Sequence, residues 1–172
     1  MKSTVESHEE RLDALDTNTE SRKGRIQALE DDKWNKIYFS AYNDEAGQVT
    51  GLLNFPKIVV NLGNAFDGAN GVFTAPVKGV YTFSFSGQQG TRVEGGDTEV
   101  EVYVKRNGEA EFAIMDDENS SGYSQRNQNI NSIFTLELDE NDEITLAVDG
   151  SDYMFTDTLR RLIFTGHLIV ET

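Results

Sequence analysis

Cysteine is absent from the 172-residue sequence, which excludes disulfide bonds, zinc–thiolate sites and catalysis by a thiol. Basic residues are few: 15 lysines and arginines face 30 acids, and the formal net charge is -15. This charge would repel nucleic acid and anionic membrane surfaces, whereas it would attract cations. We therefore expect neither nucleic acid nor a membrane surface to be a main partner.

Long apolar runs and familiar catalytic motifs are missing as well. No apolar stretch approaches the roughly 20 residues that a membrane-spanning helix needs, so membrane insertion is not expected. The opening residues MKSTVESHEERLD contain no apolar segment of the signal-peptide kind, so a secreted form is expected to have lost its signal peptide. The sequence contains no GxSxG, P-loop or HExxH motif, and we predict that the protein is not an enzyme.

Apolar residues recur every seven positions through the first 32 residues. Val5, Leu12 and Ile26 share one seam position, and Leu15 and Leu29 share the other, which is the pattern of a coiled coil. The seam also contains polar residues, so a single helix would bury little apolar surface. We predict that residues 1–32 form a stalk that is ordered only when several copies pack together.

Two similar hexads, RLDALD and RIQALE, lie two heptads apart within this segment. Arginine opens each hexad and an acid closes it, at flanking heptad positions from which both can reach a neighbouring helix. RIQALE resembles a motif associated with three-stranded coiled coils, and this resemblance implies a trimer. The alternative is a solvated helix with pairs of charges on successive turns. The predicted trimerisation residues are Leu12, Leu15, Arg25, Ile26, Leu29 and Glu30.

After residue 32 the apolar period changes from seven to two. Tyr81, Phe83 and Phe85 alternate with small hydroxyl residues, as in a strand with one buried face. Asn107-Gly108 provides the two residues that tolerate positive φ in a tight hairpin turn. We expect eight to ten strands and an all-β sandwich or jelly roll over residues 33–172. Further strands are expected at 37–42, 57–60, 100–104, 110–115, 129–138, 144–148 and 161–170.

The stretch FPKIVVNLGNAFDGANGVFTAPVKGVYTFSF resembles the signature of the globular head domain of complement C1q and its relatives. Aromatic residues, one Asn and one Gly recur in this signature at fixed spacings. The matching positions are Phe55, Asn61, Phe66, Phe73, Gly79, Tyr81, Phe83 and Phe85. The resemblance implies a ten-stranded jelly roll of the C1q and tumour necrosis factor type, assembled as a homotrimer with binding loops at the end away from the stalk. From the residues alone, we interpret these aromatics as core.

The loop Met115 to Gln125, MDDENSSGYSQ, is rich in oxygen ligands. Asp117, Glu118 and Tyr123 match in spacing a calcium-binding segment of the network collagens in this family, whereas Gln125 replaces the last acid. Calcium at Asp117 and Glu118 is therefore the one candidate cofactor, and a solvated acidic loop is the alternative. Asn119 also begins a glycosylation sequon.

Two other loops contain candidate ligand-binding residues. Arg92 belongs to a glycine-rich loop, and Tyr153 and Arg160 belong to a loop with further aromatic and basic residues that could stack on a sugar or pair with an acidic ligand. Packing in a trimer interface is the alternative for the aromatics. Together with Tyr123, these are the predicted ligand-binding residues.

The resemblance to the C1q head family implies a secreted, extracellular homotrimer. We expect it to recognise carbohydrate or a microbial surface in a lectin-like way, as in innate immunity. The alternative is a matrix, adhesion or synaptic-organiser-like protein that binds a protein receptor, calcium or mineral. A shared fold does not specify a ligand, so the sequence leaves both open.

Overall fold

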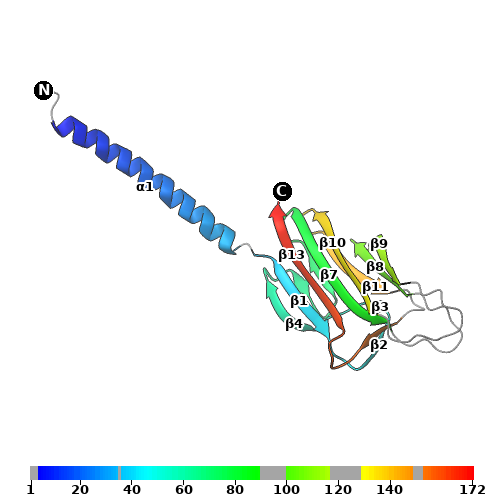
Figure 1. The fold of residues 1–172 in the computed structure, drawn as a ribbon. Helices are drawn as coiled ribbons and strands as arrows, with labels where there is room; N and C mark the ends of the chain where they lie inside the picture. Colours follow the sequence, from blue (N-terminus) through cyan, green and yellow to red (C-terminus); the bar gives the residue numbers. More distant parts are fainter. Residues whose placement is uncertain (1–3, 35, 90–99, 117–128, 149–152) are drawn as a thin grey trace, which may run out of the picture. The chain divides into compact units, whose positions relative to one another are not determined.

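The computed structural model describes residues 4–34, 36–89, 100–116, 129–148 and 153–172 (Figure 1). The chain divides into two compact units, Met1–Lys36 and Ile37–Thr172. This division lies a few residues after the boundary at 32 that the loss of the seven-residue period predicts.

The first unit contains one helix, α1 (Thr4–Trp34). It confirms the predicted N-terminal helix. The apolar seam residues lie in solvent in the single chain: Leu12, Leu15, Ile26 and Leu29 are 55–68% exposed. Self-association along this seam stays a prediction. No helix in the described part of the chain is both long enough and apolar enough to cross a membrane.

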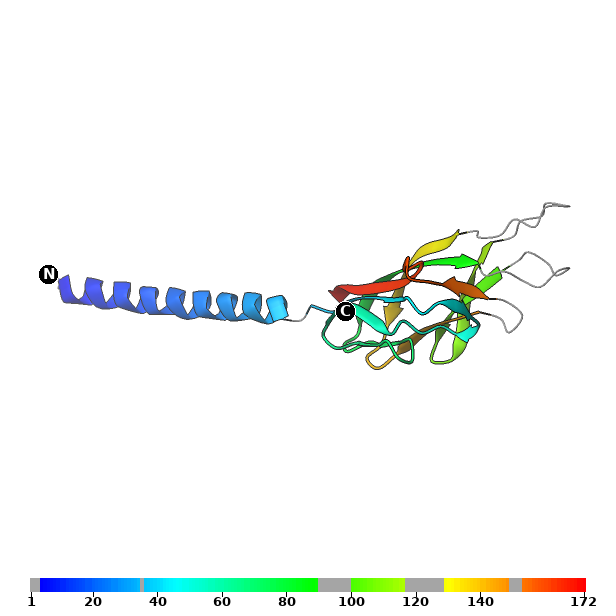
Figure 2. The same ribbon diagram turned by 90° about the horizontal axis from the view of Figure 1, so that it is seen from below.

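The second unit is a sandwich of two antiparallel sheets, which Figures 1 and 2 show from two sides. We name the sheets A and B. Sheet A contains β2 (Gly47–Val49), β12 (Met154–Thr156), β7 (Gly79–Gln89), β13 (Leu162–Glu171), β1 (Tyr38–Asn43) and β4 (Lys57–Leu62) in that order, with β10 (Asn129–Leu138) also paired to β7. Sheet B contains β5 (Phe66–Asp67), β6 (Val72–Thr74), β11 (Glu143–Val148), β8 (Val100–Arg106) and β9 (Glu109–Asp116), with β3 (Gly51–Leu52) paired to β11.

This architecture confirms the predicted all-β jelly-roll sandwich. The described residues form more strands than the ten expected, because β2, β3, β5, β6 and β12 pair over only two or three residues each. Such short pairings have no room for an alternating pattern, which explains why periodicity did not reveal them. The longer strands lie where they were expected, and β10 has the predicted bounds.

Aromatic side chains fill the space between the sheets. Tyr81, Phe83 and Phe85 are at most 1% exposed, which confirms their interpretation as core. The Phe83 ring of sheet A lies edge-on to Phe73 of sheet B, with centroids 5.1 Å apart. Phe39 of β1 stacks on Phe66 at 4.2 Å. Offset and edge-to-face geometries of this kind add to the free energy gained by burying the rings.

Two polar positions of the signature have structural roles too. The Asn61 Nδ2 donates to the Phe66 carbonyl oxygen at 2.8 Å, and the Phe66 amide donates to Asn61 Oδ1 at 3.3 Å, so one side chain clamps the short strand β5. A Cβ at Gly79 would lie 2.6 Å from the Val170 carbonyl oxygen. Glycine therefore allows β13 to approach the start of β7 closely.

The hairpin between β8 and β9 is locked to the turn before β11. Asn107 and Gly108 have φ values of 52° and 87°, which confirms the predicted positive-φ turn. The Asn107 Nδ2 donates to Asp142 Oδ1 at 2.8 Å, and Asn107 Oδ1 accepts the Glu143 amide at 2.8 Å. The hydrogen bond from Asn107, aided by the Asp139 amide and the Arg106 charge, lowers the pKa of Asp142 below 3.8 despite partial burial.

Replacing Asp142 should make stability less sensitive to acid. A carboxyl whose folded-state pKa is lowered stabilises the fold above its unfolded pKa, and this contribution disappears as pH falls through the folded pKa. Asp142→Ala should therefore lower the free energy of unfolding by about 1 kcal/mol at pH 7, and the difference should shrink as the pH drops below about 4. Denaturant titrations at several pH values measure this. Glu140→Ala, in the same turn, is the control, and a pH-independent difference for Asp142→Ala would contradict the assignment.

Candidate functional site

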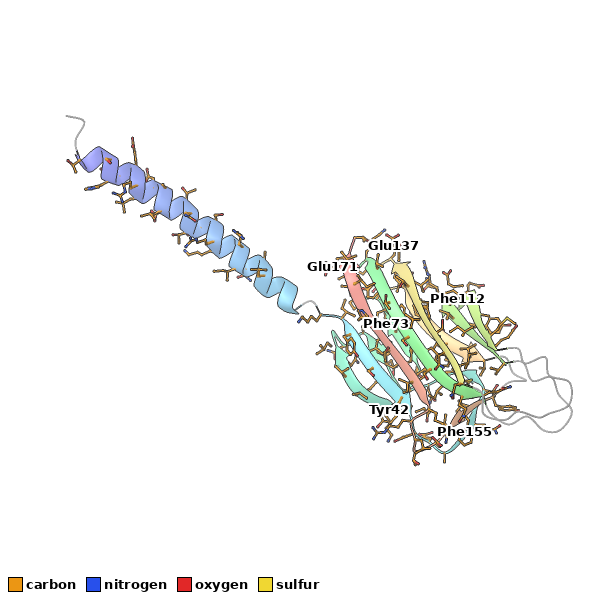
Figure 3. The ribbon with its side chains drawn as sticks, viewed as in Figure 1. Tyr42, Phe73, Phe112, Glu137, Phe155 and Glu171 are labelled. Carbon is orange, nitrogen blue, oxygen red and sulfur yellow. The ribbon has the colours of Figure 1, made fainter. Side chains whose placement is uncertain are left out.

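A basic and aromatic cluster lies where β12 turns back into β13, beside the end of β1. Figure 3 places two of its rings, Tyr42 and Phe155, near the same edge of the sandwich. We call this cluster the arginine corner. It consists of Tyr42, Lys57, Phe155, Asp157, Arg160 and Arg161.

Asp157 organises the turn that carries both arginines. Its Oδ1 accepts the Leu159 amide at 2.9 Å, and its carbonyl oxygen accepts the Arg160 amide at 3.0 Å. The turn places Arg160 at a φ of 59°, in the left-handed region. A residue with a Cβ atom is destabilised by about 1 kcal/mol or more in this conformation, whereas glycine is not.

The two adjacent arginines have different surroundings. Arg161 is held by the protein: its Nε lies 3.1 Å from Asp157 Oδ2, its guanidinium lies 5.5 Å from the Phe155 ring centroid, and it donates to Gln88. Arg160 instead lies over the Tyr42 ring, with its guanidinium carbon 4.5 Å from the centroid. No carboxylate among the described residues lies within ion-pair distance of Arg160.

A second cation stands beside the same ring. Lys57 on β4 is the register partner of Tyr42 on β1. Its Nζ lies 3.8 Å from Asp44 Oδ1, a long separation for an ion pair that is partly exposed to solvent. Tyr42 thus has a guanidinium over its ring and a loosely paired lysine as its neighbour on the adjacent strand.

The outward side of sheet A is the other notable surface of this unit. In the middle of this side the outward residues alternate with buried ones such as Phe83, and none of them is Asp, Glu, Lys or Arg, although 26% of the chain is charged. Charged residues of the same side lie at its margins, Lys57 on β4 and Glu137 near the end of β10. We call the middle part the uncharged face. It consists of Tyr38, Ser40, Thr82, Ser84, Ser86, Asn131, Ile133, Thr135, Thr165 and His167, which are brought together by the pairing of β1, β13, β7 and β10.

This face combines apolar exposure with hydroxyl groups. Ile133 is 75% exposed and Tyr38 is 39% exposed. Between β7 and β10 the surface forms a shallow depression of about 440 Å³, lined by Ser84, Phe85, Ser86, Asn131, Ser132 and Ile133. An uncharged surface in so acidic a chain is one that a partner can cover without desolvating charges.

Several predicted site residues fall outside the described parts of the chain. These are Arg92, Asp117, Glu118 and Tyr123, so calcium at Asp117 and Glu118 stays a prediction. Within the residues that the structure describes, no group of three His, Asp or Glu side chains could hold a metal ion. Tyr153 is half-buried just before β12. The predicted stalk residues lie on α1, where the side chain of Glu30 is not described.

Sequence reasoning found Arg160 and the aromatic and basic residues of its own loop, but it missed the residues that other segments place around Arg160. Tyr42 was expected in the opening strand without a role in binding, and neither Lys57 nor Asp157 was singled out. Their proximity depends on the pairing of β1 with both β4 and β13, which joins distant parts of the chain. The aspartate at the first position of a turn was the one local signal available.

Removing the Asp157 side chain should loosen the turn without affecting the core. Asp157→Ala removes the acceptor of the Leu159 amide and the partner of Arg161, and should cost about 1 kcal/mol of unfolding free energy. Thermal denaturation measures this loss. Thr158→Ala, at the neighbouring exposed position, should change stability by less than about 0.5 kcal/mol. Equal effects from the two variants would contradict the organising role of Asp157.

Comparison with known proteins gives a consistent result along most of the chain. The C1q domain family model matches residues 27–169. Complement C1q tumor necrosis factor-related protein 3 of Mus musculus is 35% identical over 127 residues, which cover 74% of this chain and 48% of the relative. The Homo sapiens protein of the same name has the same identity and coverage. The chain thus spans about half the length of these curated relatives.

Solved structures share the fold at lower identity. The globular domain of zebrafish complement 1qA protein has a TM-score of 0.59 and 19% identity, and the match covers 80% of this chain and 100% of that one. Murine APRIL at pH 5.0 has a TM-score of 0.61 and 11% identity, with coverages of 78% and 100%. Eiger TNF from S. frugiperda has a TM-score of 0.57 and 9% identity, with coverages of 80% and 94%. At these identities the likeness concerns the fold alone.

Proposed function

Because the chain belongs to the C1q domain family, we propose that it is a secreted homotrimer that binds carbohydrate or microbial surfaces in a lectin-like way, as in innate immunity. The observation that carries the trimer is the uncharged face. Copies of a chain with a net charge of -15 repel one another, and the repulsion is weakest where the approaching surface has no carboxylates. Covering this face also removes exposed apolar groups such as Ile133 from water.

The helix supplies a second site of association. The seam of α1 leaves four large apolar side chains in solvent, and packing three such helices together would bury them. We propose that Leu12, Leu15, Ile26 and Leu29 form the seam and that Arg25 pairs with the Glu30 of a neighbouring copy. Domain 1–32 is then the stalk and domain 33–172 the head.

A trimer can bind a ligand with high affinity even when each single site is weak. Three heads on one body offer three copies of each exposed loop and of the arginine corner. When one site is occupied, the next binds at a high effective concentration, and the overall affinity can exceed that of a single site by two or more orders of magnitude. Such a protein suits ligands that are repeated on a surface.

A charge placed in the uncharged face should break the trimer. Ile133→Glu would bury one carboxylate from each copy beside the others, which is unfavourable in a low-dielectric contact. We expect sedimentation velocity to give a species of 19.2 kDa for this variant and three times that mass for the parent chain. Leu52→Glu is the control, because Leu52 is 54% exposed on sheet B and should leave assembly unchanged. Because the α1 seam is a second site of association, the parent and both variants also carry Leu15→Glu and Ile26→Glu, and a trimeric Ile133→Glu protein in this background would contradict the placement of the interface.

The lectin-like function is tested by a glycan array probed with the labelled trimer at fixed calcium concentration. Saturable binding to a subset of glycans is expected, and it should weaken strongly when the trimer is dissociated by Ile133→Glu in the background of Leu15→Glu and Ile26→Glu. Uniform absence of binding, together with tight binding of a purified protein receptor, would favour an adhesion role instead.

A further inference from the structure

The arginine corner has the chemistry of a carboxylate-binding site. We propose that Arg160, held on the Tyr42 ring, binds the carboxylate of an acidic sugar of the hexuronic acid kind. This inference rests on the proposed lectin-like function, because it names a ligand class for the same heads.

Most basic residues in the described part of Ile37–Thr172 are paired with an acid. Lys57, Lys78, Arg106 and Arg161 lie within ion-pair distance of a carboxylate of the described residues, whereas Lys105 and Arg160 do not. Arg160 has no such partner in the described ranges, although Asp157 is only three residues away. Asp157 is engaged by Arg161, so the neighbouring carboxylate does not neutralise Arg160.

The side chain of Arg160 is preorganised by its turn and by Tyr42. The Asp157 turn fixes the backbone of Arg160, and the stack on Tyr42 holds its guanidinium 4.5 Å from the ring centroid. A guanidinium that lies over a ring has N–H donors that point away from the ring, and their fork geometry matches a carboxylate. The left-handed φ of 59° also has a cost that glycine or asparagine would reduce. A long basic side chain at this position is therefore explained better by binding than by the turn.

The charge of the chain favours a sugar with a single negative charge. The net charge of -15 repels nucleic acids and other polyanions, so a lone carboxylate on an otherwise neutral ligand is the anion that fits best. Next to Tyr42 on the same side of sheet A lies Ile163, which offers apolar contact to a sugar ring. Lys57 adds a second positive charge.

The experiment compares two ligands that differ only in the carboxylate. Methyl β-D-glucuronide and methyl β-D-glucoside are titrated into the ¹⁵N-labelled 172-residue chain at constant ionic strength, with sodium chloride as the compensating salt. The Arg160 Nε–H resonance, assigned by its loss in Arg160→Lys, should shift with the glucuronide and not with the glucoside. Arg160→Gln should weaken glucuronide binding tenfold or more, as expected when a charge-assisted hydrogen bond is lost.

Lys105→Gln provides the matched control, because it removes the same charge from β8 on the other sheet. It should change glucuronide affinity less than twofold. Equal weakening by Lys105→Gln and Arg160→Gln would overturn the proposal in favour of diffuse electrostatics, and equal shifts with both sugars would overturn carboxylate recognition. Equally tight binding of a blocked glutamate peptide would overturn the sugar as ligand.

Sedimentation of the same samples separates this inference from the proposed assembly. Glucuronide binding by a monomeric protein would support the arginine corner and contradict the trimer. A trimer without glucuronide selectivity would contradict the inference and leave the assembly standing.

Discussion

The packing of aromatic rings between the two sheets determines which residues of the head face solvent. Phe39, Phe83 and Phe164 meet within one cluster, so the strands that carry them cannot slip by one residue without turning these rings into water. Each buried ring contributes about 1.5–3 kcal/mol, which makes the register strongly specified. Because side chains alternate along a strand, the same register decides which residues point away from the core.

The outward residues of sheet A are therefore as well defined as the core. Those of the uncharged face include no acid, in a chain that has twice as many acids as bases, and Glu137 lies at the margin of the same side, near the end of β10. We attribute this to self-association, since contact between equally charged copies requires a surface that adds no further repulsion. The arginine corner lies at the end of the same sheet, where Tyr42 follows Ser40 on β1. In this account one side of the sandwich serves assembly, and its margin serves recognition.

Much of the fold could be predicted from sequence because its causes are local or periodic. Three local patterns each predict one conformation. The alternation of Tyr81, Phe83 and Phe85 predicts a strand, Asn107-Gly108 predicts a turn, and the seven-residue period of α1 predicts a helix. The signature positions added the family, which the comparisons confirm. The candidate site was harder to predict from the sequence. Arg160 could be suspected from its charge, but its contact with Tyr42 exists only because β13 pairs with β1. Its difference from Arg161 arises because Asp157 forms its ion pair with Arg161.

The central claim is that copies of the chain cover the uncharged face of sheet A, and the lack of native cysteine allows a direct test. A single cysteine is introduced at Ser84, in the middle of this face, or at Thr145, a half-buried position on β11 of sheet B, and its rate of reaction with a bulky maleimide is measured at rising protein concentration. The account predicts that the cysteine at position 84 becomes protected as the protein assembles, while the cysteine at position 145 reacts at a constant rate. Equal, concentration-independent reaction at both positions would contradict it.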